Sequence, residues 1–288
     1  MGVFNEFTCK TSPFMLKIDL HLHSAFSDGV FSPTELVQRL KARKIVVASL
    51  TDHDTTDGVG EFLTLCRRAA IKGVAGVELS ASHTKVMHIL GYRINVADLA
   101  LRAALEKNKN VRQARNILIF EKLRALGFDL YIEEAAAYAD GVIGRPHIAR
   151  LLWDKGYVRN LKSAFDKYLK RGAAAYVPRQ LLQPEECVSL IRKAGGLPVL
   201  AHPRQTVTDL DDIAPILRRL KDAGLWGLEC WSQGNSPVDI YRLLGIAADY
   251  DLFPTAGSDF HGGGHISTTM GVVVGEGILP WGRLCGGL

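Results

Sequence analysis

The chain has 288 residues, of which 47% are hydrophobic and 23% charged, and it carries a formal net charge of +5 with a sequence pI near 8.9. This composition is typical of an ordinary globular protein, and the length fits one large domain or one domain with an insertion. The dispersed basic charge favours an anionic ligand and argues against a role in coating DNA. No apolar run approaches the roughly 20 residues of a membrane span, so no membrane partner is expected.

The cysteines argue against a disulfide framework. They are scattered, odd in number and never form a Cys-x-x-Cys pair, at positions Cys9, Cys66, Cys187, Cys230 and Cys285. A structural zinc knuckle is disfavoured for the same reason. The pattern predicts a protein of the reducing cytoplasm.

Residues 1–15 are predicted to be a disordered leader ahead of the first strand. Residues 1–14 contain a single basic residue, Lys10, and no long apolar core, so they do not resemble a signal peptide. The apolar residues Met15, Leu16 and Ile18 then open a pattern with a period of two, which is typical of a strand.

This first strand ends in paired histidines. His21 and His23 are two positions apart, so they project from the same face, and Asp28 follows at a glycine turn. Two imidazoles and a carboxylate are the beginning of a metal site. Taken alone, the pair favours a buried polar ladder that neighbouring backbone groups satisfy, so the metal site depends on what the rest of the chain supplies.

The next segments repeat the order strand, polar end, helix. Ser32 and Pro33 predict the start of a helix that runs through residue 43. A strand over 45–50 ends in Thr51-Asp52-His53-Asp54, a helix covers about 60–72, and a strand over 73–79 contains Glu78. This order predicts an α/β sheet or barrel, in which function collects at the carboxyl ends of the strands.

After a fourth strand over 88–92 the pattern becomes mainly helical. Helices are predicted over 101–126, 132–139, 147–155 and 161–170. We interpret residues 99–175 as a helical insertion in a barrel formed by residues 16–98 and 176–288. The aromatic residues at helical spacing are predicted to form the core of the insertion and are Trp153, Tyr157, Phe165 and Tyr168.

The barrel pattern resumes after the insertion. A helix over 184–194 precedes a strand over 197–200, which is followed by His202. A helix over 213–223 leads to a strand at 227–230, where Glu229 is predicted to lie behind the ligands, and the last strand end carries Asp259 and His261.

Imidazoles and carboxylates thus recur at successive strand ends. The candidate metal ligands are His21, His23, Asp28, His53, Glu78, His88, His202, Asp259 and His261. The absence of thiolates favours Mn, Fe or Zn in a hydrolytic site. Nine donors are more than one ion needs, which implies two or three ions. Glu78 is the candidate for the carboxylate that bridges two of them. Such a cluster deprotonates water near neutral pH and clamps the oxygens of a phosphoryl transfer.

Five motifs resemble those of the PHP (polymerase and histidinol phosphatase) superfamily. They are Asp-x-His-x-His-x3-Ser-Asp-Gly at 19–29, Thr-Asp-His-Asp at 51–54, Gly-Val-Glu at 76–78, Val-Leu-Ala-His-Pro at 199–203 and Gly-Ser-Asp-Phe-His at 257–261. Within the superfamily they are most similar to the branch of nucleoside 3′,5′-bisphosphate phosphatases and 5′-to-3′ exoribonucleases.

The resemblance implies a distorted (β/α)7 barrel that holds up to three metal ions, usually Mn²⁺, with Zn²⁺ or Fe²⁺ as alternatives. One ion would be held by His21, His23, Glu78 and Asp259. A second would be held by Glu78, His88 and His202, and a third by Asp28, His53 and His261. Some relatives carry histidine in place of Asp28, so occupancy of the third site is the weakest implication of the resemblance.

The resemblance also implies substrate contacts. Arg112 and Arg115 lie three residues apart on a predicted helix and share a face, and Arg145 stands before Pro146 and His147. Alone, this pattern fits a solvated basic face. Similar positions in the nucleotide phosphatase branch contact substrate, as does the residue that matches Asp54. Guanidinium groups bind phosphate in a bidentate manner, while His147 fits either a substrate contact or an internal helix cap.

The resulting hypothesis is a hydrolase that removes the 3′-phosphate from nucleoside 3′,5′-bisphosphates by attack of a metal-bound hydroxide, without a protein nucleophile. The nearest alternative is a 5′-to-3′ exoribonuclease acting on short or 5′-phosphorylated RNA. More distant alternatives are a histidinol-phosphate phosphatase and a non-catalytic module stabilised by metal. The sequence does not fix the metal, the substrate length or the oligomeric state.

Overall fold

The structure is a computed structural model that describes residues 15–139, 141–232, 234–262 and 269–285. The predicted leader therefore lies outside the described residues, apart from Met15, which begins the first strand. None of the helices in these ranges combines the length and the apolar character that a membrane span requires.

The strands form one sheet in the order β7-β6-β5-β4-β3-β2-β1-β8. Their bounds are β1 (Met15–Leu22), β2 (Val47–Leu50), β3 (Lys72–Ser80), β4 (His88–Tyr92), β5 (Leu197–Leu200), β6 (Gly227–Trp231), β7 (Phe253–Ala256) and β8 (Val272–Gly275). Neighbouring strands are parallel, except that β4 runs antiparallel to β3 and β5, and β8 runs antiparallel to β1.

The sheet curls until its two ends nearly meet. Beyond β7, Phe260 forms a bridge with Leu22 at the end of β1, and the backbone N–H of His23 donates to the carbonyl of Phe260 at 3.0 Å. Gly257 makes this approach possible, because an added Cβ would lie 2.3 Å from the Cβ of His21. The nearly closed barrel confirms the predicted α/β barrel, and β8 adds an antiparallel strand beside β1.

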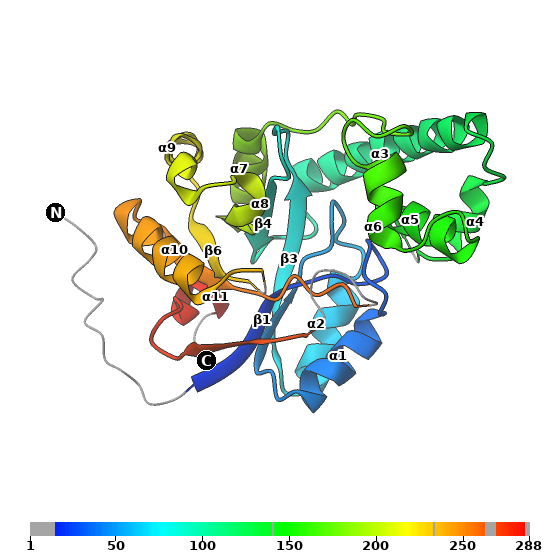
Figure 1. Cartoon of the computed structure of the whole chain (residues 1–288). Coiled ribbons are helices and arrows are strands. Elements are labelled where there is room, and N and C mark those ends of the chain that lie inside the picture. The colour runs from blue at the N-terminus through cyan, green and yellow to red at the C-terminus, as the bar shows by residue number, and fades with distance from the viewer. Residues whose placement is uncertain (1–14, 140, 233, 263–268, 286–288) are drawn as a thin grey trace.

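Helices cover the outside of this barrel (Figure 1). Their bounds are α1 (Pro33–Ala42), α2 (Val59–Arg68), α7 (Pro184–Lys193), α8 (Pro203–Thr206), the 3₁₀ turn η3 (Leu210–Ile213), α9 (Ala214–Asp222), α10 (Pro237–Asp249) and α11 (Trp281–Cys285). Ser32 and Glu35 form the capping box that starts α1. The predicted helix over 60–72 ends earlier, because Lys72 already belongs to β3.

Between β4 and α7 the chain forms α3 (Leu99–Ala125), α4 (Ile132–Ala136), α5 (Arg145–Asp154), α6 (Leu161–Ala164) and the π-helical turn η2 (Phe165–Leu169). Figure 1 shows α3 leading away from the barrel to the other helices, which lie together at one side. They enclose their own apolar cluster, which includes Ile119, Phe120 and Leu152. That this segment is a separate domain stays a prediction.

The aromatic residues of this segment differ in burial. Tyr157, Phe165 and Tyr168 pack against the apolar cluster as predicted. Trp153, in contrast, is 39% exposed and lies beneath the guanidinium of Arg150, 5.0 Å from its ring centroid. The prediction that Trp153 is a core residue is therefore wrong, because its ring supports a charged side chain at the surface.

The barrel interior is filled by apolar side chains and closed by α11. Tyr92, Leu90 and Val199 from central strands pack in one cluster with Trp281 and Leu284 of α11. The side chain of Arg93 also donates to the carbonyl of Arg283 at 2.7 Å. This packing fills the end of the barrel at which α11 lies. The opposite rim, where β3 ends and β4 begins, carries polar side chains.

Candidate metal centre

The candidate ligands come from strand ends that meet on one rim. His21 and His23 lie at the end of β1, Glu78 lies near the end of β3, and His202 follows β5. His88 is the first residue of β4, but β4 is antiparallel to β3 and pairs His88 with Ser80. The amino end of β4 therefore lies on the same rim as the carboxyl ends of its antiparallel neighbours, β3 and β5.

Glu78 lies at the centre of this cluster. Its Oε2 is 3.3 Å from His21 Nε2, 3.2 Å from His23 Nε2 and 2.9 Å from His53 Nδ1. Its Oε1 is 2.9 Å from His88 Nδ1 and 3.0 Å from His202 Nε2. One carboxylate thus faces five imidazoles from four different segments of the chain, which is the position expected of a bridging ligand.

Three groups of side chains each bring their ligand atoms within 4.8 Å of one another. The groups are His21, His23, Glu78 and Asp259; His53, Glu78 and His88; and His23, Asp28, His53 and His261. The first equals the ligand set implied for one ion. In the second, His202 also lies close, 3.1 Å from His88 Nδ1.

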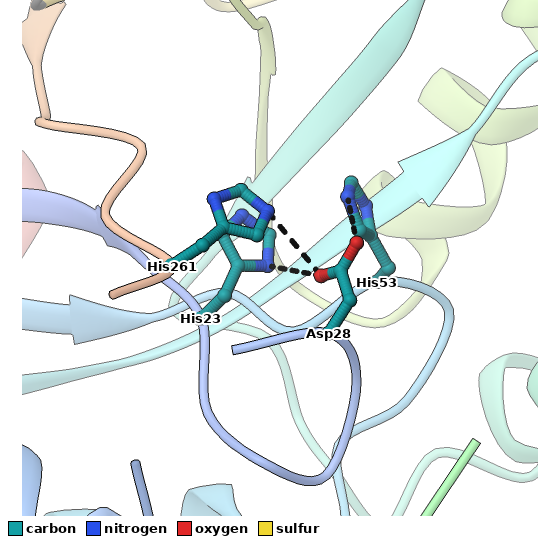
Figure 2. A group of neighbouring side chains, drawn as sticks. All are labelled: His23, Asp28, His53 and His261. Carbon is teal, nitrogen blue, oxygen red and sulfur yellow. Dashed lines mark ion pairs between the residues drawn. The ribbon is translucent and has the colours of Figure 1, made fainter. Parts of the chain in front are cut away.

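Figure 2 shows the third group, in which the carboxylate of Asp28 lies between three histidine rings. Its oxygens are 3.3 Å from His261 Nε2, 3.8 Å from His23 Nδ1 and 3.8 Å from His53 Nε2. The group equals the set predicted for a third ion with His23 added. All nine predicted ligands thus lie together, although their role as ligands stays a prediction.

Buried atoms without hydrogen bonds support a metal at this site. Within the described part of the chain, no contact with hydrogen-bond geometry is found for His21 Nε2, either ring nitrogen of His23, His53 Nδ1, Glu78 Oε2 or His202 Nδ1, although several of these atoms lie close to one another. Buried polar atoms are rarely left unpaired in folded proteins, and an ion is one explanation when they are. Imidazole and carboxylate donors around one point fit a divalent cation.

The protonation states of the two central donors also suit a cation. Burial alone would raise the pKa of Glu78, but the surrounding His53, His88 and His21 hold it well below its usual value. Burial lowers the pKa of His88 to about 4 despite the nearby Glu78. At neutral pH Glu78 is therefore ionised and His88 neutral. Nearby carboxylates outweigh burial and raise the pKa of the other five histidines, so these imidazoles would release protons when an ion binds.

Further buried carboxylates hold the ligands in place from behind. Glu229 accepts a hydrogen bond from His21 Nδ1 at 2.9 Å and another from the backbone N–H of His202 at 2.7 Å. The His21 tautomer that donates to Glu229 leaves Nε2 facing Glu78 with a lone pair. Asp52 likewise accepts from the hydroxyls of Ser24 and Ser27, and so fixes the loop that carries Asp28.

The backbone is strained at two of the candidate ligands. His202 has φ of 25° and Asp259 has φ of 54°, in the left-handed region that non-glycine residues rarely adopt. Asp54, beside the ligand His53, also has φ of 54°. Such strain persists where surrounding contacts enforce it, and it gathers at functional sites.

An arginine cluster adjoins the metal centre through Asp54. Asp54 Oδ2 accepts from Arg112 Nη2 at 2.5 Å and from Arg179 Nη1 at 3.1 Å. Burial and the neighbouring Arg112, Arg179 and Arg145 lower the pKa of Arg115, which shows that these guanidinium groups lie close enough to repel one another. The arginine cluster therefore consists of Arg112, Arg115, Arg145 and Arg179.

The cluster has an excess of positive charge. Neither Arg115 nor Arg145 has an ion pair with a carboxylate among the described residues; Arg115 donates to Asn116 Oδ1 at 2.7 Å and Arg145 to the carbonyl of Leu169 at 3.2 Å. Arg112 and Arg115 are each only 8% exposed. Partly buried guanidinium groups in excess of carboxylates form a site for an anion such as phosphate.

One predicted contact also has a structural role, and the arginine cluster contains one residue that was not predicted. His147 Nδ1 accepts from the backbone N–H of Gly144 at 3.0 Å, so it caps α5. Its role as a substrate contact stays a prediction. Arg179 was not predicted, because it lies in a segment without helix or strand. The only signal in the sequence was its position, where the chain returns from the helical segment to the barrel.

Comparison with known proteins identifies the family. The model of the PHP domain matches residues 19–183. A "3',5'-nucleoside bisphosphate phosphatase" of Chromobacterium violaceum is 36% identical over 89% of this chain and 91% of its own length. A "5'-3' exoribonuclease" of Haemophilus influenzae is 34% identical over 85% of this chain and 90% of its own length.

A solved structure agrees with these relatives. It is described as an amidohydrolase from Chromobacterium violaceum with bound sulfate and no metal, and it covers 92% of this chain and 94% of its own. The TM-score is 0.85 at 34% sequence identity. The match of the family model to more than half of the chain, together with these likenesses, shows that the chain belongs to the PHP domain family.

Proposed function

We propose that this protein is a metal-dependent phosphoesterase that removes the 3′-phosphate from nucleoside 3′,5′-bisphosphates and releases nucleoside 5′-monophosphates. The observation that carries the proposal is the junction between the two halves of the site. His53 belongs to the metal centre, and the next residue, Asp54, anchors Arg112 and Arg179. A substrate with two phosphates can place one in each half.

The relatives support this substrate class. The relative from Chromobacterium violaceum is named for the same reaction, and it aligns over most of both chains. The similar solved structure holds sulfate, which has the tetrahedral shape and negative charge of phosphate. Both facts fit a site built for phosphate esters.

We assign two or three divalent ions to the metal centre, with Mn²⁺ as the first choice and Zn²⁺ or Fe²⁺ as alternatives. His21, His23, Glu78 and Asp259 would hold one ion, Glu78, His53, His88 and His202 a second, and the group drawn in Figure 2 a third. When bound, such ions supply Lewis acidity and lower the pKa of a water molecule to near neutrality.

The residues of the chain would orient the substrate for this chemistry. The arginine cluster would bind the phosphate that is not cleaved, and so hold the other phosphate over the metal centre. Asp54 would keep two guanidinium groups in place. No protein nucleophile is proposed, because burial raises the pKa of the Cys230 thiol and the hydroxyls of Ser24 and Ser27 donate to Asp52.

Phosphate release tests the proposal directly. The purified protein with added Mn²⁺ should release inorganic phosphate from adenosine 3′,5′-bisphosphate and leave adenosine 5′-monophosphate, identified by chromatography. Glu78→Gln should abolish release. A folded protein with bound metal that releases no phosphate would refute the activity.

A second candidate is a 5′-to-3′ exoribonuclease, which the relative from Haemophilus influenzae favours at 34% identity. Turnover of adenosine 3′,5′-bisphosphate should be compared with that of a 5′-phosphorylated oligoribonucleotide. The proposal predicts the higher kcat/KM for the mononucleotide, and the reverse order would favour the exoribonuclease.

We also propose a cytoplasmic location. Cys66, Cys187 and Cys230 are buried and free, as is usual in a reducing compartment.

A further inference from the structure

A cavity of about 360 Å³ lies between the barrel and the helices of residues 99–175. One wall is the loop after β1, with Ala25, Asp28 and Val30. The opposite wall comes from α5 and from residues between α4 and α5, and includes Ala137, Tyr138 and Arg150. This volume is in the range of small-molecule sites in proteins.

The cavity touches both halves of the proposed active site. Asp28, at one wall, belongs to the group of side chains in Figure 2. Pro146 and His147 also line the cavity, directly after Arg145 of the arginine cluster. A molecule that spans the metal centre and the arginine cluster can therefore extend a third group into this space.

The walls offer flat and apolar surfaces. Alanines at 25, 137 and 139 leave room that larger side chains would fill. The hydroxyl of Tyr138 donates to Asp154 at 3.0 Å, and Arg150 Nε donates to the same carboxylate at 3.0 Å. Because Asp154 holds both side chains, the Tyr138 ring and the Arg150 guanidinium are fixed planar groups at the wall.

Planar groups of this kind stack on nucleobases. An aromatic ring or a guanidinium plane binds any base through its π-face, with little dependence on base identity. The polar atoms of Tyr138 and Arg150 already engage Asp154, so they are poorly placed to read the edge of a base. The chemistry of the cavity fits a nucleobase bound mainly by stacking.

We propose that this cavity is the nucleobase subsite of the enzyme. The inference rests on the proposed function, since it places the base of a nucleoside 3′,5′-bisphosphate whose phosphates lie at the metal centre and the arginine cluster.

The test fills the cavity from an exposed position. Ala137→Trp places a large ring in the cavity, and Ala136→Trp is the matched control, because Ala136 is also exposed but does not line it. Turnover of adenosine 3′,5′-bisphosphate is compared with that of 1-deoxyribose 3,5-bisphosphate, which lacks the base. Binding of both compounds is measured by calorimetry in parallel.

We expect Ala137→Trp to raise KM and Kd for adenosine 3′,5′-bisphosphate at least tenfold, and to change those for the base-free compound less than twofold. Ala136→Trp should change neither. Equal effects of the two variants, or equal loss for both compounds, would overturn the subsite. Wild-type protein that binds the nucleotide without hydrolysing it would refute the proposed function, and the Kd values would still decide the subsite. Failure to bind the nucleotide at all would overturn both.

Discussion

Asp54 anchors two arginines in the structure, and its role as a substrate contact stays a prediction. Its carboxylate accepts from the backbone and hydroxyl of Ser80, from Asn108 Nδ2 and from two guanidinium groups. Burial alone would raise its pKa, but Arg179 and Arg112 outweigh burial and hold the pKa far below the usual value. Because its acceptor positions are occupied, we expect Asp54 to act on the substrate through Arg112 and Arg179.

Replacement of Asp54 should therefore affect substrate binding more than the chemical step. Asp54→Asn removes the charge that anchors two guanidinium groups, so we expect KM for adenosine 3′,5′-bisphosphate to rise about tenfold with a smaller change in kcat. Breaking a buried ion pair should also lower the free energy of unfolding by about 3 kcal/mol. Steady-state kinetics and urea unfolding measure the two effects.

Asp57→Asn is the matched control, because Asp57 is an exposed acid in the same loop. It should leave KM and stability unchanged. An unchanged KM in Asp54→Asn would show that Arg112 and Arg179 do not depend on this carboxylate.

Glu229 tests how far the metal centre depends on residues that do not reach the metal. In Glu229→Gln one carboxylate oxygen is replaced by an NH₂ group, which accepts no hydrogen bond. The side chain can then no longer accept from both His21 Nδ1 and the N–H of His202. Loss of such a partner typically weakens metal affinity by roughly 10-fold to 100-fold. We expect this loss for Mn²⁺, measured by competition with a chelating dye.

Glu106→Gln, at an exposed position on α3, serves as the comparison for Glu229→Gln and should bind Mn²⁺ like the wild type. If both variants had the same metal affinity, the hydrogen bonds of Glu229 would have no part in orienting the ligands.

The sequence was sufficient to predict side chains that follow regular strands. His53 and His202 stand directly after short apolar runs, so their place on the rim follows from the strand direction. Arg179 could not be found in this way, because residues 171–182 contain neither helix nor strand, apart from an isolated bridge at Leu182. Its place beside Asp54 depends on the tertiary path of the chain.

At the scale of elements, periodicity predicted which segments are regular better than it predicted their direction or their limits. The antiparallel course of β4 depends on which edge of β3 the chain meets after the turn at 81–87, and residue pattern does not encode that choice. α10 was missed although Ser236 and Asp239 form a capping box at its start. β8 and α11 were missed because each is short and stable only against the barrel.

α11 gives the first prediction at this scale. Leu284 is fully buried among barrel residues, so Leu284→Ala should lower the free energy of unfolding by about 2–5 kcal/mol. The kcat of the folded enzyme should stay unchanged, since α11 packs at the end of the barrel opposite the candidate metal centre. Urea unfolding and phosphatase kinetics of the same preparation measure both quantities.

Gly282→Ala is the control in α11, because an added Cβ there meets no atom within 4 Å. It should not destabilise the protein. If Leu284→Ala lowered kcat without lowering stability, α11 would be coupled to the active site instead of closing the barrel.

α3 gives the second prediction, because it carries Arg112 and Arg115 on its buried face and exposed charges elsewhere. Arg115→Gln removes a guanidinium group that we expect to bind the phosphate that is not cleaved. The loss also relieves repulsion with the other arginines of the cluster. We expect KM for adenosine 3′,5′-bisphosphate to rise about tenfold, and KM for p-nitrophenyl phosphate, which lacks that phosphate, to stay within twofold. Steady-state kinetics on both substrates measures the difference.

Arg102→Gln, at an exposed position of the same helix, should change neither KM. Equal losses on both substrates in Arg115→Gln would mean that the arginine supports the fold and does not select a second phosphate.

At the scale of the molecule, the barrel brings distant segments of the chain together. Asp19 in β1 accepts hydrogen bonds from the backbone and hydroxyl of Ser258, at a separation of 239 residues. This contact fixes the segment that carries Asp259 beside His21 and His23. The metal centre is therefore complete only when both ends of the barrel sheet have met.

Metal binding should consequently stabilise the whole molecule as well as permit turnover. The centre gathers donors from segments that are far apart in the unfolded chain, so an ion binds the folded state preferentially. At a free metal concentration of about 100 times Kd, binding adds about 2.7 kcal/mol to the free energy of unfolding. Removal of metal with EDTA should therefore lower Tm by several degrees and abolish phosphate release, and added Mn²⁺ should restore both.

Scanning calorimetry and phosphate assays on the same samples measure this coupling, and Glu78→Gln is the control. Since Glu78 faces five imidazoles from four segments, its variant should gain little Tm from Mn²⁺. An unchanged Tm after chelation would mean that no ion couples the segments. A lower Tm with full phosphatase activity would assign the metal a structural role alone, because an ion needed for phosphoryl transfer cannot be removed without loss of turnover.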